Sequence, residues 1–278
     1  MSLSVLILTL NEEANLPNCL ASLAWCDDIV VLDSYSTDRT VQIATAAGAR
    51  VVQRHFDSWD RHQNWAMEHI AFKHPWVYYT DADEVVPEDL RQEMLSIVSA
   101  PSPPHVAYRV RYKNFFCRRW IKHCGIYPVW VLRLFRPETV RWERLVNPVP
   151  VVNGSVGRLN GHFHHYSFHK GYEAWFSKHN HYSSQEAQEG MRSAADGFHD
   201  WQGLFCLKDA SRRRSALKEL SFRLPCRPLL RFLYMYVLRL GMLDGIAGFR
   251  YCRLLAIYEY MIVLKMQEYG LRARGLSL

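Results

Sequence analysis

The sequence predicts an α/β fold built on a mainly parallel sheet and followed by a helical C-terminal extension. Three observations support this fold class. Short apolar runs alternate with helix-like segments over the first hundred residues, polar side chains follow the predicted strands, and the last third is helical and basic. An alternation of strand and helix favours a parallel sheet with helices on both faces.

The first predicted strand is the continuous apolar run LSVLILTL at 3–10, which is typical of a strand buried on both faces. Four apolar residues then follow at helical spacing and predict a first helix. They are Leu16, Cys19, Leu20 and Leu23.

The next strand–helix–strand unit lies between residues 29 and 54. IVVLD at 29–33 predicts a second buried strand, and TDRTVQIATAAGA at 37–49 predicts a helix that Ser36 or Thr37 would cap. ARVVQR at 49–54 predicts a third short strand.

The remaining elements are less regular. We expect a helix over 59–71 and a fourth strand within 75–84, and both continue the alternation. Alternating polarity predicts strands over 106–116 and 129–137, and helical character returns over 169–190.

Polar clusters stand directly after three of the predicted strands. In parallel sheets ligands bind at the carboxyl ends of the strands. We therefore expect the three clusters to converge on one crevice. They are Thr9 to Glu12, Asp33 to Ser36, and Asp81 to Asp83.

The charge is distributed unevenly along the chain. The net charge is +7, yet residues 204–278 contain 14 Lys and Arg against 5 Asp and Glu, so the basic surplus belongs to this segment. The segment is strongly apolar but has no uncharged run close to the ~18–20 residues that span a bilayer. Arginines and aromatics mixed into amphipathic helices favour a helix lying in the plane of an anionic membrane surface. A helical cap on the core and a homodimer interface are the alternatives.

The cysteines and the N-terminus indicate a reducing compartment. Seven cysteines are scattered without a CxxC pair, which favours reduced thiols over a disulfide framework. No basic segment precedes the first apolar run, so we expect no signal peptide and a location on the cytoplasmic face of the inner membrane.

The acid cluster Asp81, Asp83 and Glu84 allows three interpretations. Acids at a strand end are common in solvated turns. A strand ending in DxDx[TV] also begins certain phosphatases, but three strands precede this one, and the later acidic pair of those enzymes is absent. The third interpretation is a site where one carboxylate binds a sugar hydroxyl and the other a divalent cation that neutralises a diphosphate.

Four motifs in order and spacing resemble the family 2 glycosyltransferases, over about residues 3–95. They are LTLNEEANLPNCLASL, VVLDSYSTDRTVQIATAAGARV, QNWAM and VYYTDADE. Two later stretches, HHYSFHKGYEAWFSKHNHYSSQEA and RLPCRPLLRFLYMYVLRLGMLDGIAGF, resemble a bacterial subgroup with lipopolysaccharide-core and exopolysaccharide enzymes.

The resemblance implies a GT-A fold and inverting transfer of a sugar from a nucleoside diphosphate, with UDP expected, to a lipopolysaccharide-core or lipid-linked acceptor. It divides the chain into a nucleotide-sugar half (1–100), an acceptor half (101–203) and a basic helical extension (204–278). Asp83 would bind Mg²⁺ or Mn²⁺ and act in catalysis, while Asp38 and Thr40 are expected to be structural. The expected donor-binding residues are Leu8, Thr9, Leu10, Glu12, Asp33, Arg61, Asn64 and Asp81.

The general base is where the sequence departs from the resemblance. Subgroup members tend to have an acid where this chain has Pro148, and proline cannot accept a proton. Glu143 is the nearest carboxylate and is the predicted base, although a surface acid paired with Arg141 or Arg144 is the alternative. The histidines from His162 to His181 would be structural, bind zinc, or supply a base or metal ligand. His164 and His165 are the candidates for this last role, with His165 as the expected metal ligand.

Other function classes fit less well. A nucleotidyltransferase would need a glycine-rich basic loop after the first strand, and NEEANLP has no glycine. The only observation that favours a catalytically weakened subunit of a membrane assembly complex is Pro148 at the position where an acid is expected. We expect no nucleic acid as a partner, because the basic and aromatic residues lie in a hydrophobic segment instead of a polar groove.

Overall fold

The computed structural model describes residues 3–143, 148–196, 200–206, 210–224 and 226–277. These form two compact units. The first, here called the sheet unit, contains Met1–Trp120 and Gly125–Lys170. The second, the helical unit, contains Ile121–Cys124 and Gly171–Leu278.

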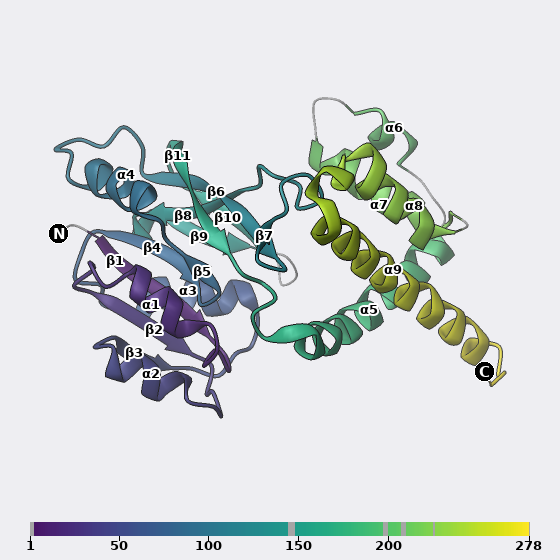
Figure 1. Ribbon diagram of the computed structural model, residues 1–278, viewed down its shortest axis with the longest axis horizontal. Helices are drawn as coiled ribbons and strands as arrows, with labels where there is room; N and C mark the ends of the chain where they lie inside the picture. The colour runs from purple at the N-terminus through teal and green to yellow at the C-terminus, as the bar shows by residue number, and fades with distance from the viewer. Residues whose placement is uncertain (1–2, 144–147, 197–199, 207–209, 225, 278) are drawn as a thin grey trace. The chain divides into compact units, whose positions relative to one another are not determined.

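The first half of the large sheet is parallel, as the sequence predicts. Its strands run in the order β3-β2-β1-β4, and the register pairs every neighbour in parallel. The strands are β1 (Leu3–Thr9), β2 (Ile29–Asp33), β3 (Arg50–Gln53) and β4 (Trp76–Asp81). The connecting helices are α1 (Leu16–Ser22), α2 (Thr40–Ala46) and α3 (Trp59–His69), shown in Figure 1.

The second half of the sheet continues from β4 in the order β8-β6-β11-β5. Strand β8 is antiparallel to both β4 and β6, whereas β6 and β11 are parallel. These strands are β5 (Glu84–Val85), β6 (Ala107–Phe116), β8 (Trp130–Phe135) and β11 (Val156–His165), with β7 (Arg119–Trp120) paired to β6. Beside them lie helix α4 (Glu88–Val98), the 3₁₀ turn η1 (Pro137–Thr139) and the hairpin β9 (Val140–Glu143) with β10 (Val149–Val152).

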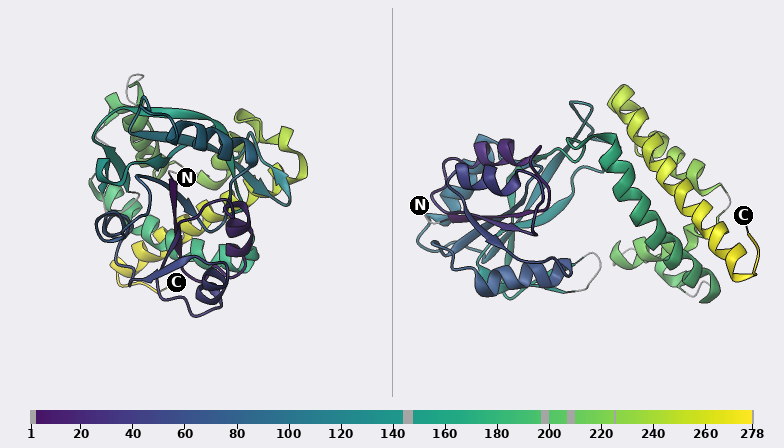
Figure 2. Two further views of the ribbon diagram at one scale, coloured as in Figure 1. Left: turned by 90° about the vertical axis from the view of Figure 1, so that its left-hand side faces the viewer. Right: turned by 90° about the horizontal axis from the view of Figure 1, so that it is seen from below.

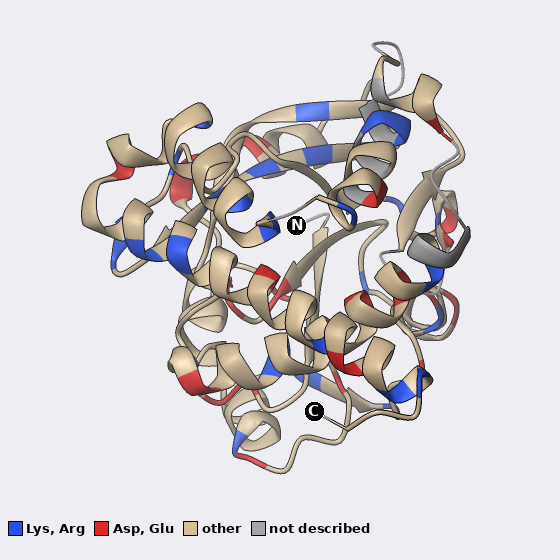
Figure 3. Ribbon diagram, turned by 90° about the vertical axis from the view of Figure 1, so that its right-hand side faces the viewer, with Lys and Arg blue, Asp and Glu red and all other residues tan. Residues whose placement is uncertain are grey.

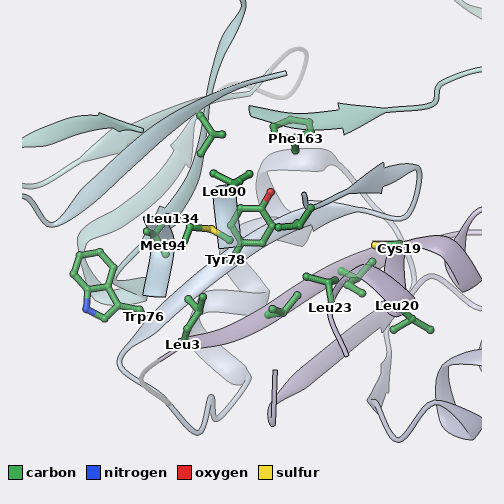
Figure 4. Packing of buried hydrophobic residues seen from close by; sticks show 14 of the residues in the cluster. Leu3, Cys19, Leu20, Leu23, Trp76, Tyr78, Leu90, Met94, Leu134 and Phe163 are labelled. Atoms are coloured by element: carbon green, nitrogen blue, oxygen red, sulfur yellow. The ribbon is translucent and has the colours of Figure 1, made fainter. Parts of the chain in front are cut away.

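Two apolar clusters lie on opposite sides of the sheet, because side chains alternate along each strand. Tyr78 and Leu90 belong to the cluster beneath α1 and α4 (Figure 4). Tyr79 and Trp142 belong to the cluster shared with α3 and β9. This double burial explains why β1 and β4 read as continuous apolar runs.

The predicted cap of α2 by Ser36 or Thr37 is wrong. Ser36 donates its hydroxyl to Asp33, and Thr37 donates its hydroxyl to Asn11. The carboxylate of Asp38 instead accepts a 3.0 Å hydrogen bond from the Thr40 backbone N–H at the start of the helix. Asp38 is thus the structural residue that its turn motif implies.

The helical unit is built around one long helix. Helices α5 and α8 pack against α9, and basic and acidic residues are distributed along these helices (Figures 2 and 3). The elements are α5 (Gly171–Asp196), α6 (Trp201–Leu204), α7 (Ala210–Ser221), α8 (Arg227–Leu233), η2 (Tyr234–Leu238), η3 (Gly241–Asp244) and α9 (Gly245–Ala273). The expected boundary at residues 203/204 does not coincide with the boundary between the two units, because α5 packs against α9 and belongs to the helical unit.

The short segment Ile121–Cys124 belongs to the helical unit, where hydrogen bonds to one buried carboxylate hold it in place. Asp244 accepts hydrogen bonds from the backbone N–H groups of Lys122, His123 and Cys124, at 3.2, 2.9 and 2.9 Å. These donors hold the pKa of Asp244 below its usual range, although burial opposes them.

Among the described residues, no helix taken alone has the length and apolar character needed to cross a membrane. The consecutive stretches Arg227–Leu238 and Gly241–Ala273 meet that criterion only when taken together, and they are bent by 74° at the break.

Candidate functional site

The ends of three parallel strands meet at one edge of the sheet. Thr9 pairs with Asp33 across β1 and β2, and Leu8 pairs with Asp81 across β1 and β4. The hydroxyl of Thr9 donates to the Asp33 carboxylate at 2.9 Å. The polar clusters that follow these strands therefore lie together, which confirms the convergence predicted from the sequence.

Asp33 is fully buried and braces this edge. Its carboxylate accepts four hydrogen bonds, from the Thr9 hydroxyl, the backbone and hydroxyl of Ser36, and the side-chain amide of Gln53. Burial alone would raise the pKa of Asp33, but these donors outweigh it and lower the pKa. The structure thus gives Asp33 a role in joining the strands, and a direct bond to a nucleotide base stays a prediction.

The two leucines predicted to line the donor pocket differ in exposure. Leu8 is 8% exposed and packs in the core, whereas Leu10, just beyond β1, is 51% exposed. Only the Leu10 side chain is therefore available to a ligand in this conformation.

Glu12 is held beside the same edge by Lys170. The ammonium of Lys170 pairs with the Glu12 carboxylate, and Asn15 donates to it at 2.7 Å. Burial raises the pKa of Glu12, and the nearby charge of Asp83 adds to the shift against the effect of Lys170. Glu12 and Asp83 thus act on one another electrostatically, as members of one site.

A buried arginine, Arg133 on β8, neutralises part of the acid cluster. Its guanidinium pairs with Asp81 at 2.7 Å and with Glu84, and Glu84 also accepts a hydrogen bond from Thr80. Burial raises the pKa of Glu84, and the charge of Arg133 opposes that shift without cancelling it.

Sequence reasoning missed Arg133. The only signal was one charged residue inside the apolar run VWVLRLF, where a buried charge requires a partner of opposite sign. The partner could not be named from the sequence, because Asp81 lies 52 residues away.

A chain of hydrogen bonds also reaches Asp81 from α3. Gln63 donates its amide to the Tyr79 hydroxyl at 3.1 Å, and Tyr79 donates to Asp81 at 3.2 Å. Gln63 is buried, and its hydrogen bond fixes the orientation of Tyr79. Asp81 is therefore positioned from two sides, by Arg133 and by Tyr79.

Asp83 lies beside His165, at 3.3 Å between the carboxylate and the imidazole Nε2. The two side chains are 24% and 26% exposed, so both can meet a ligand. Burial would lower the pKa of His165, but the bond to Asp83 and the charges of Asp83, Glu84 and Asp81 outweigh it and raise the pKa.

The residues present fit part of a divalent metal site. Within the described parts of the chain, no group of three or more His, Cys, Asp or Glu side chains is arranged to hold a metal ion. However, Mg²⁺ in phosphate-binding sites usually takes one or two carboxylates and completes its shell with phosphate oxygens and water. Asp83, with His165 beside it, matches that smaller protein contribution.

Asn64 and Arg61, both on α3, have different surroundings. The Asn64 amide exchanges two hydrogen bonds of 2.8 Å with the backbone of Trp142, and these bonds attach β9 to α3. Arg61 is exposed, and the neighbouring Arg54 pairs with Asp57 at 2.8 Å and contacts the buried His62 at 2.9 Å. A contact of Asn64 or Arg61 with the donor stays a prediction.

Glu143, the predicted base, ends β9 and pairs in register with Val149 of β10. Its side chain is exposed, and in the described residues it forms no ion pair with Arg141. Residues 144–147, which include the second proposed partner Arg144, lie outside the described residues, and Pro148 directly precedes β10.

Comparison with known proteins finds relatives that are named as glycosyltransferases. The chain is 24% identical to an uncharacterized glycosyltransferase of Rickettsia typhi, over 98% of this chain and 89% of that protein. It is 36% identical to the lipopolysaccharide core biosynthesis glycosyltransferase LpsC of Rhizobium meliloti, over 41% of this chain and 43% of LpsC. Among solved structures, S. aureus TarS 1–349 is similar with a TM-score of 0.44 and 15% identity, over 91% of this chain and 90% of that chain.

The family assignment rests on the sequence profile described as glycosyl transferase family 2, which matches residues 4–162. That match covers more than half of the chain and includes β1 to β4, the acid cluster and Arg133. The expected GT-A type of α/β fold is confirmed. The chain is a glycosyltransferase and belongs to glycosyl transferase family 2.

Proposed function

We propose that this glycosyltransferase moves a sugar from a nucleoside-diphosphate sugar, with UDP as the nucleotide, to a saccharide acceptor with inversion. The observation that supports this best is the cluster at the strand ends. Asp81 is fixed by Arg133 and Tyr79, while Asp83 stays partly exposed beside His165. One acid is thus oriented for a sugar or ribose hydroxyl, and the other is available for the diphosphate end of the donor.

Asp83 and His165 would hold Mg²⁺ or Mn²⁺ together with the donor. A bound cation would supply positive charge to the leaving diphosphate, where negative charge builds up as the sugar departs. Asp81 would bind and orient a hydroxyl of the donor, and the ion pair with Arg133 holds Asp81 in place for that task.

Glu143 is the proposed general base. Inversion in one step needs a group that removes the proton of the acceptor hydroxyl. The hydrogen bonds between Asn64 and Trp142 fix the strand that Glu143 ends. Because the Glu143 side chain is exposed, an acceptor hydroxyl can reach its carboxylate.

The acceptor is proposed to be a lipopolysaccharide-core or lipid-linked saccharide. The support is the likeness to LpsC, whose name assigns it to lipopolysaccharide core biosynthesis.

The direct test is the release of UDP from a panel of UDP-glucose, UDP-galactose and UDP-N-acetylglucosamine with Mn²⁺. We expect one donor to be turned over, and Asp83→Asn to abolish turnover. Glu143→Gln should lower kcat by about 10²–10⁴-fold, the usual contribution of a general base. Glu138→Gln, at an exposed acid on the preceding turn, is the matched control and should leave kcat unchanged.

A second candidate is a catalytically weakened subunit, favoured only by Pro148 at the position where an acid is expected. It predicts that UDP binds but that no donor of the panel is turned over. Failure of every nucleotide to bind would contradict both proposals.

The helical unit is proposed to attach the protein to the cytoplasmic face of the inner membrane. Large apolar side chains are exposed around the bend between α8 and α9, and arginines such as Arg250 and Arg253 are exposed nearby on α9. The most exposed are Leu229, Leu238, Leu243 and Ile246, at 55%, 74%, 58% and 71%. Apolar residues flanked by cations favour binding to an anionic lipid surface.

Sedimentation with vesicles tests this attachment. The protein should sediment with phosphatidylglycerol-containing vesicles more than with pure phosphatidylcholine, and Leu238→Glu should weaken that binding. Leu276→Glu, at a leucine 54% exposed near the C-terminus, is the control. Equal sedimentation of Leu238→Glu and the wild type would contradict the proposal.

A further inference from the structure

One face of the second half of the sheet carries aromatic and basic side chains in cross-strand rows. In register, Arg111 of β6 pairs with Trp130 of β8 on one side and His162 of β11 on the other. Two residues further, Lys113 pairs with His164. Side chains two apart on a strand share a face, so these five form one surface, here called the basic-aromatic face. The three strands lie side by side in Figure 1.

The cations of this face lie against aromatic rings, and Arg111 also donates a hydrogen bond to the backbone carbonyl of Asn160. Arg111 lies 5.6 Å from the centroid of Trp130 and 5.8 Å from that of Tyr127, and Lys113 lies 4.7 Å from that of Trp120. Neither Arg111 nor Lys113 forms an ion pair with a carboxylate in the part of the chain that the structure describes. The Nε of Arg111 is buried without a hydrogen-bond partner there.

The two histidines add ring surface to this face. The rings of His162 and His164 stack with centroids 5.6 Å apart. Phe115 extends the surface, with its ring 4.9 Å from His164.

The basic-aromatic face lies toward the same end of the sheet as the acid cluster. Strand β8 runs antiparallel to β4, so its first residue, Trp130, lies toward the end of β4 where Asp81 is found. Strand β11 contributes to both regions. Its residue His165 contacts Asp83, and the adjacent His164 lies on the other face of the strand, in the basic-aromatic face.

We propose that the basic-aromatic face binds the acceptor, and that the acceptor is a saccharide carrying a phosphate or carboxylate group. Aromatic rings present flat apolar surface on which the C–H face of a sugar packs, and Arg and Lys side chains bind phosphate and carboxylate oxygens. The combination fits an anionic sugar better than a neutral one. This inference rests on the proposed transferase function and specifies its acceptor.

The test compares matched sugars in ligand-observed NMR, with UDP and Mn²⁺ present. The probes are methyl glucoside, methyl glucoside 6-phosphate, methyl glucuronide and inorganic phosphate. We expect the two anionic sugars to bind about tenfold more tightly than the neutral one, the usual effect of a charge-assisted hydrogen bond. Lys113→Gln and Arg111→Gln should each remove most of that preference.

The control variant is Lys73→Gln, which removes the same charge at the amino end of the sheet, where Lys73 pairs with Asp27. It should keep the preference for anionic sugars. Affinity for UDP should be unchanged in all three variants.

Three results would overturn the inference. Equal affinity for neutral and anionic sugars would show that the acceptor needs no negative charge. Inorganic phosphate that binds as tightly as the sugar phosphate would show that this face does not recognise the sugar. A loss of UDP affinity in Lys113→Gln would assign the cations to the donor instead. Absence of UDP binding to the wild type would instead contradict the proposed function itself, so the two failures can be distinguished.

Discussion

The two ends of the parallel strands use buried carboxylates in opposite ways. At the amino end, Asp28 is 5% exposed and its two oxygens are fully matched by donors. It accepts hydrogen bonds from the Ser4 hydroxyl, the Lys73 backbone N–H at 2.8 Å and the Arg50 guanidinium at 2.9 Å. One acid thus joins the start of β1 to the segment before β4 and to β3.

At the carboxyl end, Asp33 is matched by donors in the same way, but the acids at and just after the end of β4 outnumber the cations that meet them. Asp81 and Glu84 share Arg133, and Asp83 has His165 beside it. The exposed fractions of Asp81 and Asp83 are 38% and 24%, so their charge faces a ligand. The difference teaches how to separate structural from functional acids: the first are matched by donors inside the fold, and the second retain exposed negative charge at a strand end.

The largest expected effect follows from removing the shared cation. Arg133→Met leaves Glu84 buried and without its counter-charge, so the free energy of unfolding of the sheet unit should fall by about 3–5 kcal/mol. Urea denaturation of the full chain measures it.

The matched control is Arg91→Met, which breaks the exposed pair with Glu88 and should leave the stability nearly unchanged. Adding Glu84→Gln to Arg133→Met should recover part of the loss. If Arg133→Met were as stable as the wild type, Arg133 would not be the counter-charge of the cluster.

The amino end should respond next. Asp28→Asn weakens bonds to charged and neutral donors at once, and we expect a loss of about 2–3 kcal/mol in the free energy of unfolding. UDP affinity should not change, because Asp28 lies at the opposite end of the strands from the acid cluster. Asp27→Asn, at the exposed neighbour, is the control. If Asp28→Asn lost UDP affinity without losing stability, Asp28 would be a donor-binding residue and not a structural one.

The pH dependence of stability should have opposite signs at the two ends. Bonds from Ser4, Lys73 and Arg50 lower the pKa of Asp28 against the effect of burial, so its contribution is present above about pH 4 and is lost as the pH falls. Burial raises the pKa of Glu84, so its contribution is full below about pH 4 and is lost as the pH rises toward the folded pKa.

Unfolding measured from pH 3 to 8 separates these two contributions. Glu84→Gln should remove the decline above about pH 4, by about 1.4 kcal/mol for each unit by which the pKa is raised. Asp28→Asn should flatten the decline below that pH. Identical pH profiles for Glu84→Gln and the wild type would show that folding does not shift the pKa of Glu84.

The smallest effect is expected from the hydrogen bonds that orient Asp81. Tyr79→Phe removes one donor to Asp81 and leaves the ring in place, so stability should fall by about 1 kcal/mol. KM for the donor should rise while kcat changes less. Tyr78→Phe, on the opposite face of β4, is the control. An unchanged KM in Tyr79→Phe would mean that Arg133 alone positions Asp81.

The parallel half of the sheet could be predicted from the sequence because its signals are local. LSVLILTL and IVVLD are apolar runs of strand length, and the acids at 81–84 follow a run of the same kind. The convergence of their ends then follows from the geometry of parallel strands alone.

The rest of the site depends on contacts between distant residues, which local patterns do not encode. Arg133 reaches Asp81 only because β8 lies beside β4, and Asn64 meets Trp142 across 78 residues. The cap of α2 was also wrong for this reason, since Thr37 is drawn toward Asn11, 26 residues away.

The central claim is that the partly exposed acids at the end of β4, Asp81 and Asp83, bind the donor while the buried Asp28 at the amino end holds the fold. Calorimetric titration of UDP with Mn²⁺ into Asp83→Asn, beside urea denaturation of the same preparation, tests it most directly. The account predicts that UDP binding in the presence of Mn²⁺ is abolished and that the free energy of unfolding is unchanged or slightly higher. Wild-type UDP affinity in Asp83→Asn, or a loss of stability as large as that of Asp28→Asn, would contradict it.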